Sequence, residues 1–154
     1  MTLESDLVAT AQTLVRKPVS DVFDAFANAE SMSRFWFTRR DDGLRAGETV
    51  AWYLGPEPDA LRTDIRVTSL ERPNLIVMEW ENAGGFTTVT WTFEEKGPNT
   101  TLLRVEETGY SADPETNLAA VRDSIGGFNQ VIIAAKAWLE HRAPINVIAD
   151  HAGD

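Results

Sequence analysis

The sequence contains no cysteine and only two histidines, His141 and His151, both within the last 14 residues of a chain of 154. The lack of cysteine excludes disulfides, thiolate metal sites and cysteine nucleophiles. A histidine metal site or a catalytic triad would need histidines elsewhere in the chain. We therefore expect a site that works without a metal or any other cofactor.

Basic residues and long apolar runs are also scarce. The chain has 14 Lys and Arg against 24 Asp and Glu, a net charge of −10. A negative field of this size opposes nucleic acids and anionic membranes as partners. No apolar run approaches the roughly 18 residues of a membrane span. The segment Met1 to Asp6 has neither the basic start nor the apolar core of a signal peptide, so we expect a cytoplasmic protein.

The composition that remains is that of an ordinary globular protein, with 43% apolar and 25% charged residues. A chain of this length usually forms one domain and buries about two-thirds of its unfolded surface. We expect a single domain over residues 1–154, with an ordered core from about residue 7 to about residue 143 and a loosely held tail.

Alternation of apolar and polar residues predicts six strands. The first covers Leu7 to Lys17, and five more follow one another between Gly47 and Glu107. Pro- and Gly-rich turns separate these five segments, as in an antiparallel meander. Each segment has one apolar and one polar side, which is typical of a sheet that faces solvent on one side.

Helical spacing predicts two short helices between the first two strands, one starting at Ser20 as N-cap and one over Ala29 to Phe37. The polar segment Arg39 to Gly43 indicates a loop. A long C-terminal helix is expected after Asp113 as N-cap and Pro114 as first residue. Its apolar stripe consists of Leu118, Val121, Ile125, Phe128, Ile132, Ala135 and Leu139.

This order of elements predicts an α+β fold in which a curved, six-stranded antiparallel sheet wraps around the long C-terminal helix. The long helix is the only element able to cover the apolar face of the sheet, and the short helices would close one end. A strongly curved sheet does not close perfectly on one helix. We therefore expect a cavity between them, and apolar cavities are the usual sites for small molecules.

Several segments resemble, in order along the chain, the START-like, helix-grip (SRPBCC) superfamily. They are Phe35-Trp36-Phe37 with Gly43, Gly47 and Glu48; Glu71-Arg72-Pro73 before Leu75–Trp80; Thr87–Phe93; Thr100–Glu106; and Gly127-Phe128 with Trp138-Leu139-Glu140. The closest resemblance is to bacterial homologues of the C-terminal domain of the heat-shock chaperone ATPase activator, and it covers Leu7 to Arg142. The sequence departs from this branch at Phe128, where Trp is more usual, and at Gly126, which doubles the helix glycine.

The resemblance implies the helix-grip fold and several activities: lipid and sterol transfer, polyketide cyclisation, hormone binding or chaperone activation. A fold does not choose among these activities, so the choice depends on the site.

The candidate site is the apolar face of the sheet and the facing side of the helix. The residues expected to contact a ligand are Phe35, Trp36, Trp52, Ile65, Met78, Trp80, Trp91, Glu107, Ile125, Phe128 and Ile132. For the tryptophans, core packing and a cavity wall both remain open. Glu107 shares the inner side with Thr63, Asn82 and Thr87, and these polar groups form either a solvated rim or anchors in the pocket. Gly127 is expected where the helix approaches the sheet closely.

We expect the protein to bind a small apolar or aromatic ligand in this cavity. Two alternatives stay open: an interaction module similar to the chaperone activators, and a cofactor-free cyclase- or hydrolase-like enzyme in which Glu107 acts with a water. A chaperone partner is less favoured, because the family's activators carry a second domain for which we expect no room. An edge strand at Val50 to Leu54 could pair with a copy of itself in a homodimer.

Overall fold

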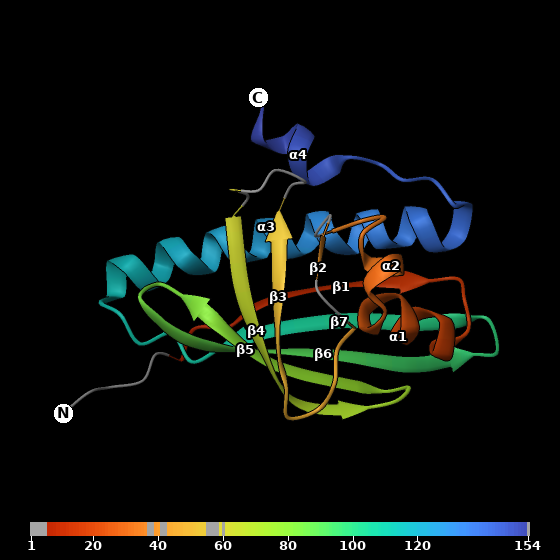
Figure 1. Ribbon diagram of the computed structural model, residues 1–154, viewed down its shortest axis with the longest axis horizontal. Coiled ribbons are helices and arrows are strands. Elements are labelled where there is room, and N and C mark those ends of the chain that lie inside the picture. Colours follow the sequence, from red (N-terminus) through yellow and green to blue (C-terminus); the bar gives the residue numbers. More distant parts are fainter. Residues whose placement is uncertain (1–5, 37–38, 41–42, 55–58, 60, 154) are drawn as a thin grey trace.

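The computed structural model describes residues 6–36, 39–40, 43–54, 59 and 61–153. One antiparallel sheet curves around one long helix, as Figure 1 shows. The elements in chain order are β1 (Ala9–Val15), α1 (Val19–Ala27), α2 (Ala29–Met32), β2 (Arg39–Arg40), β3 (Thr49–Leu54), β4 (Leu61–Glu71), β5 (Leu75–Asn82), β6 (Gly85–Gly97), β7 (Thr100–Thr108), α3 (Pro114–His141) and α4 (Val147–Ala152). The strands lie in the order β1-β7-β6-β5-β4-β3-β2, and the expected α+β helix-grip architecture is confirmed.

The six long strands match the six that alternation predicts, and the structure adds a seventh. The two residues of β2 pair with β3, so that Arg39 lies opposite Tyr53 and Arg40 opposite Trp52. This short strand falls within the segment Arg39 to Gly43, which the sequence indicated as a loop. It covers part of the outer edge of β3, the edge considered above for pairing with a second copy.

The core lies on the concave face of the sheet, and cross-strand register explains why it is dense. Trp91 in β6 lies between Ile76 of β5 and Val105 of β7, and all three are fully buried. Helix α1 closes one end of this face: Phe26 lies 4.7 Å from Trp91 between ring centroids. The helix begins at Val19 with Pro18 in the cap position, so the expected N-cap role of Ser20 is wrong.

Helix α3 crosses the concave face and begins as predicted. Pro114 is its first residue, and the Asp113 side chain accepts a hydrogen bond of 2.9 Å from the backbone N–H of Thr116. Its inward stripe differs from the predicted one in its first half. Leu118 and Ile125 are 43% and 37% exposed, whereas the polar Ser124 faces the sheet side.

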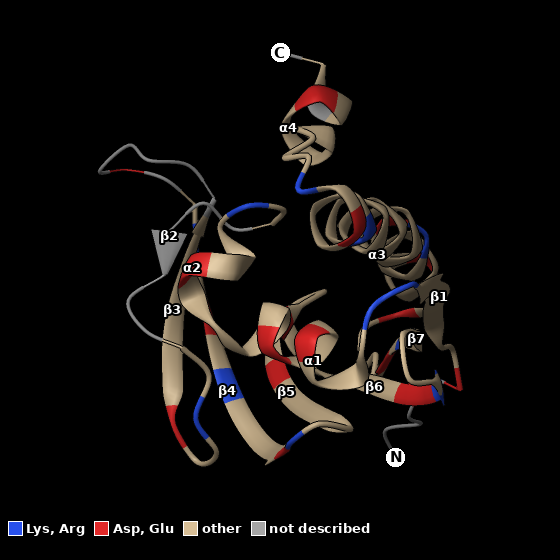
Figure 2. Ribbon diagram, turned by 90° about the vertical axis from the view of Figure 1, so that its right-hand side faces the viewer, with Lys and Arg blue, Asp and Glu red and all other residues tan. Residues whose placement is uncertain are grey.

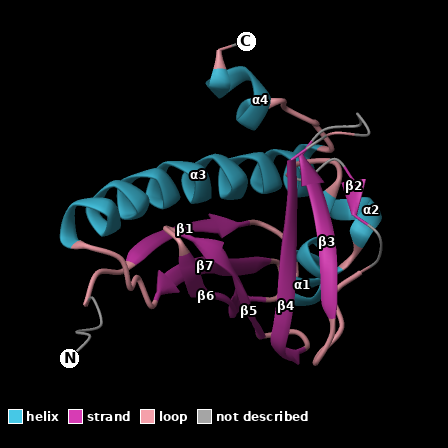
Figure 3. Ribbon diagram, turned by 60° about the vertical axis from the view of Figure 1, so that its left-hand side comes forward, coloured by secondary structure: helices cyan, strands magenta, loops and turns pink. Residues whose placement is uncertain are grey.

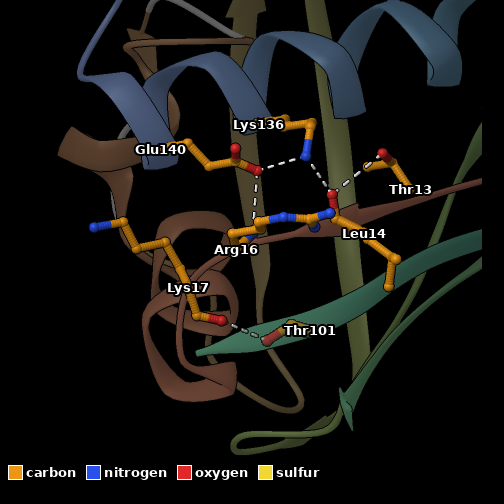
Figure 4. Close-up of polar contacts among 7 residues, drawn as sticks. All are labelled: Thr13, Leu14, Arg16, Lys17, Thr101, Lys136 and Glu140. Carbon is orange, nitrogen blue, oxygen red and sulfur yellow. Dashed lines mark hydrogen bonds and ion pairs between the residues drawn. The ribbon is translucent and has the colours of Figure 1, made fainter. Parts of the chain in front are cut away.

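The last turns of α3 are fastened to the edge strand β1 by side chains (Figure 4). The Lys136 ammonium donates to the backbone carbonyl of Leu14 at 2.6 Å and to the Glu140 carboxylate at 2.5 Å. Glu140 in turn accepts the backbone N–H of Arg16 at 3.0 Å. Two backbone groups of an edge strand are thereby satisfied by a helix, which is one way in which proteins protect sheet edges.

Helix α4 follows α3 beyond residue 143, in the segment for which the sequence predicts a loosely held tail. It lies over α3 (Figure 3), and Val147 and Ile148 are partly buried against the hydrophobic core. Among the residues that the structure describes, no helix has the length and apolar character needed to cross a membrane.

Candidate functional site

A pocket of about 250 Å³ lies beside α3. Its other walls come from the end of β5, from Trp36 after α2, and from α4. Figure 2 shows how α2, α3 and α4 surround this region of the molecule. Residues from four separate parts of the chain line it: Trp36, Trp80, Asp123, Ser124, Gly127, Phe128, Gln130, Val131 and Ile148. Most of the wall is apolar, which is typical of a small-molecule site.

Three aromatic rings form much of the wall, and they are oriented differently. Trp36 stands at 79° to Trp80, with ring centroids 6.1 Å apart. Phe128 lies parallel to Trp80, at an interplanar angle of 1° and a centroid distance of 6.1 Å. Trp36 also packs edge-on against the buried Trp52, which fixes it to the core. The pocket therefore presents ring surfaces in two roughly perpendicular planes.

Behind this wall lies Glu107, a fully buried carboxylate that accepts five hydrogen bonds from neutral groups. Its Oε2 atom accepts from Trp80 Nε1 at 2.6 Å, Thr87 Oγ1 at 2.5 Å and Asn82 Nδ2 at 3.1 Å. Its Oε1 atom accepts from Tyr110 and Ser124 hydroxyls, at 2.6 and 2.5 Å. Within the described part of the chain, this carboxylate forms no ion pair.

Strand register brings these donors together. Trp80 in β5 lies directly opposite Thr87 in β6, and Glu107 lies opposite Val89, two residues further along β6. Side chains two residues apart point to the same face of a strand, so the three polar groups share the concave side. Ser124 reaches them from α3. The carboxylate thus connects three strands with the helix and holds two pocket residues, Trp80 and Ser124, in place.

The charge of Glu107 is stabilised by this arrangement. Burial raises the pKa of the carboxyl, but the hydrogen bonds from Ser124, Thr87, Trp80 and Tyr110 outweigh burial and lower the pKa below its ordinary value. The same burial, together with the bond to Glu107, raises the pKa of the Tyr110 hydroxyl well above its usual range. Glu107 is therefore an ionised carboxylate and a weak base, with Tyr110 as a neutral donor.

The structure brings together four of the residues proposed from the sequence: Trp36, Trp80 and Phe128 on the pocket wall, with Glu107 behind it. Six others are buried in the hydrophobic core: Phe35, Trp52, Ile65, Met78, Trp91 and Ile132. Ile125 needs correction, because it is 37% exposed and lies outside the pocket wall. A helix turns by about 100° per residue, so when Ser124 faces inward its neighbour faces away.

The pocket also includes Ser124, Val131 and Ile148, which the sequence did not predict, and the expected role of Gly127 is wrong. A Cβ built on Gly127 would meet no atom within 4 Å, so close approach to the sheet is not the reason for this glycine. Gly127 instead borders the pocket. The spacing of positions 121, 124, 128 and 131 on one helix face could have placed Ser124 inside. A polar residue within an apolar stripe was the available signal.

The fold and the pocket define a helix-grip α+β protein with a cavity beside its long helix. Residues 16–135 match the family model described as Activator of Hsp90 ATPase homolog 1-like protein. Because this match covers most of the chain, the chain belongs to that family, and the resemblance noted from the sequence is confirmed. No curated protein matches the chain.

Solved structures share the fold at low sequence identity. The protein SSP2350 from Staphylococcus saprophyticus is 24% identical, with a TM-score of 0.76 over 91% of this chain and 96% of that one. DynU16, from the dynemicin biosynthetic locus, is 19% identical with a TM-score of 0.77, and the match spans 91% of this chain but 49% of DynU16. The Aha1 dimer from Colwellia psychrerythraea is 12% identical, with a TM-score of 0.72 over 88% and 97% of the two chains.

Proposed function

We propose that the protein binds a small apolar or aromatic molecule in the pocket between α3, α4 and the end of β5. The observation that supports this most is the ring-lined wall of Trp36, Trp80 and Phe128 around a volume of about 250 Å³. Aromatic rings favour flat apolar partners through stacked and edge contacts. A volume just below the roughly 300–1,000 Å³ of most ligand pockets suits a compound of one or two rings.

The polar side of the pocket disfavours anions. Asp123 lies on the wall, and the ionised Glu107 lies directly behind Trp80 and Ser124. Of the described lining residues, none is Lys, Arg or His. A carboxylate ligand would therefore enter a negative field without a counter-charge, in a molecule that already carries a net charge of −10. We expect neutral ligands to bind better than carboxylates of the same shape.

The alternatives have less support. A filled core with a large exposed apolar patch would favour an interaction module. This protein has a concave pocket instead. An enzyme that uses Glu107 as a base requires contact with substrate, yet its side chain is fully buried and its lowered pKa makes it a weak base. The family name and the dimeric neighbour keep a chaperone partner and a homodimer as secondary proposals.

The test compares two glycines that are neighbours on α3. Gly127 borders the pocket, whereas Gly126 is exposed, and at both positions a Cβ has open space. Gly127→Leu should fill the pocket and abolish binding of meta-tert-butylphenol measured by calorimetry. Gly126→Leu should bind as the parent does. A glycine inside a helix lowers helix stability by about 1 kcal/mol relative to Ala. Replacing either glycine should therefore not unfold the protein.

The same titration with meta-tert-butylbenzoate examines the preference for neutral ligands. The benzoate should bind at least about tenfold more weakly than the phenol, a difference of about 1.4 kcal/mol. If no neutral one-ring or two-ring compound binds saturably, or if Gly127→Leu binds as well as Gly126→Leu, the pocket is not the ligand site. The interaction-module alternative would then be the better proposal.

A further inference from the structure

We propose that the pocket selects organic ammonium cations carried on an apolar or aromatic body, an inference that rests on the proposed ligand-binding function. Three independent observations lead to it. They are the direction in which the polar groups of the wall already donate, the charges around the pocket, and the arrangement of its rings.

Two hydrogen-bond donors of the wall, those of Trp80 and Ser124, are already engaged. The indole N–H of Trp80 and the hydroxyl of Ser124 both donate to Glu107, at 2.6 and 2.5 Å. Ser124 also accepts from Asn82 at 3.3 Å. A serine whose proton is engaged offers a ligand only its lone pairs, and the Asp123 carboxylate likewise only accepts. This side of the pocket therefore suits a ligand that donates hydrogen bonds or carries positive charge.

The charges around the pocket have one sign. Asp123 contributes an exposed carboxylate at the wall, and Glu107 contributes a buried one immediately behind it. Glu107 is surrounded by neutral donors, so no neighbouring cation among the described residues cancels its field. Charges that are partly shielded from water act more strongly on a bound ligand than exposed ones do. A cation in the pocket would therefore be attracted from two directions.

The rings provide the remaining part of the site. Cations are attracted to the faces of aromatic rings, most strongly to Trp, and groups of such rings recognise quaternary ammonium ions in other proteins. Here Trp36 and Trp80 stand nearly perpendicular, and Phe128 lies parallel to Trp80. Because the Trp80 N–H donates to an anion, its ring gains electron density, which strengthens attraction of a cation.

The experiment compares two ligands of the same shape that differ in charge: (meta-hydroxyphenyl)trimethylammonium and meta-tert-butylphenol. Their apolar areas are nearly equal, so a difference in affinity reports the charge. The intact protein should bind the ammonium compound about tenfold more tightly at low ionic strength. Added salt should reduce this ratio, because it screens the exposed Asp123.

Two charge-removing variants show where the preference arises. Asp123→Asn should weaken binding of the ammonium compound about threefold more than it weakens binding of the phenol. Glu95→Gln removes the same unit of charge at the exposed, opposite end of β6 and should change neither affinity. Equal losses in both variants would place the attraction in the overall charge of the molecule and overturn selection by the pocket.

The outcomes separate this inference from the proposed function. If the phenol binds as tightly as the ammonium compound, and Gly127→Leu abolishes binding of the phenol, the proposed preference for cations is wrong. The proposed ligand-binding function is then still supported. If neither compound binds, the proposed function fails, and with it the inference. Tighter binding of the ammonium compound that is lost in Gly127→Leu supports both.

Discussion

Glu107 is held by five hydrogen-bond donors, an arrangement that suits a carboxylate better than a neutral side chain. Three donors meet at its Oε2 atom and two at its Oε1 atom. In Glu107→Gln, an amide NH₂ replaces one oxygen and meets groups that donate hydrogen bonds. These groups must then turn or lose their partner. Unsatisfied buried donors cost about 1–3 kcal/mol each, so the variant should lose roughly 3–5 kcal/mol of unfolding free energy in urea titrations.

The adjacent Glu106 provides the matched control. It lies on the opposite face of β7, where it pairs with Arg104 at 2.6 Å, and both side chains are about 40% exposed. Pairs this exposed contribute about 0–1 kcal/mol, so Glu106→Gln should lose less than about 1 kcal/mol. Similar losses in the two variants would show that the buried network adds nothing beyond an ordinary surface contact.

The turn between β5 and β6 holds one residue in a strained backbone conformation. Ala83 has φ of 55° and Gly84 has φ of 80°, so both central residues of this two-residue hairpin lie in the left-handed region. Glycine adopts that region freely, but alanine does not, and Asn-Gly is the preferred pair in such turns. We expect Ala83→Asn to stabilise the protein by about 0.5–1 kcal/mol.

Thermal unfolding tests this prediction, with Ala46→Asn as the control. Ala46 is also exposed, but its φ is not positive, since among the described non-glycine residues only Ala83 and Arg142 have positive φ. The control should therefore gain nothing. A melting temperature that rises equally in both variants would attribute the gain to surface polarity rather than to the turn.

Elements with a long periodic pattern could be predicted from the sequence, whereas β2 and α4 could not. The alternation between Gly47 and Glu107 predicts five strands because each has one buried side. The two residues of β2 carry no period, and only their pairing with β3 makes them a strand. Helix α4 has six residues and is positioned by packing of Val147 and Ile148, which a local pattern does not contain.

The candidate site was predictable in part, for a related reason. Strand alternation predicted that Trp80 faces inward, and helical spacing predicted the same for Phe128. Neither pattern distinguishes a pocket wall from the core that holds Trp91. That distinction depends on what lies opposite each ring. Ser124 was missed because a hydrophobic pattern gives weight to Ile125, while a buried carboxylate on a distant strand decides which of the two faces inward.

The stability of the whole molecule should depend on pH through two opposing effects. Acidification reduces the net charge of −10 and so reduces self-repulsion. Protonation of Glu107 acts in the other direction. Its folded pKa is lower than its ordinary value near 4.5, so its ionisation stabilises the fold fully above that value. This stabilisation is lost as the pH falls through the folded pKa.

A comparison of two proteins isolates the second effect. The difference in unfolding free energy between the parent and Glu107→Gln should stay constant from about pH 7 to about pH 5 and shrink below about pH 4.5. Subtracting the variant removes the charge-repulsion effect that both proteins share. A difference that persists unchanged at the lowest accessible pH would mean that Glu107 does not titrate with the fold.

Among the described residues, the pocket wall and the buried core share Phe128 and Val131 and otherwise differ. Trp52, Trp91, Ile65 and Met78 fill the interior, whereas Gly127, Gln130 and Ile148 border the pocket without belonging to the buried core. Substitutions at the second group can change what fits without disturbing the first. A fold organised in this way can diversify its ligands through few mutations, each nearly neutral for folding. Related proteins can therefore come to bind different ligands while they keep the same fold.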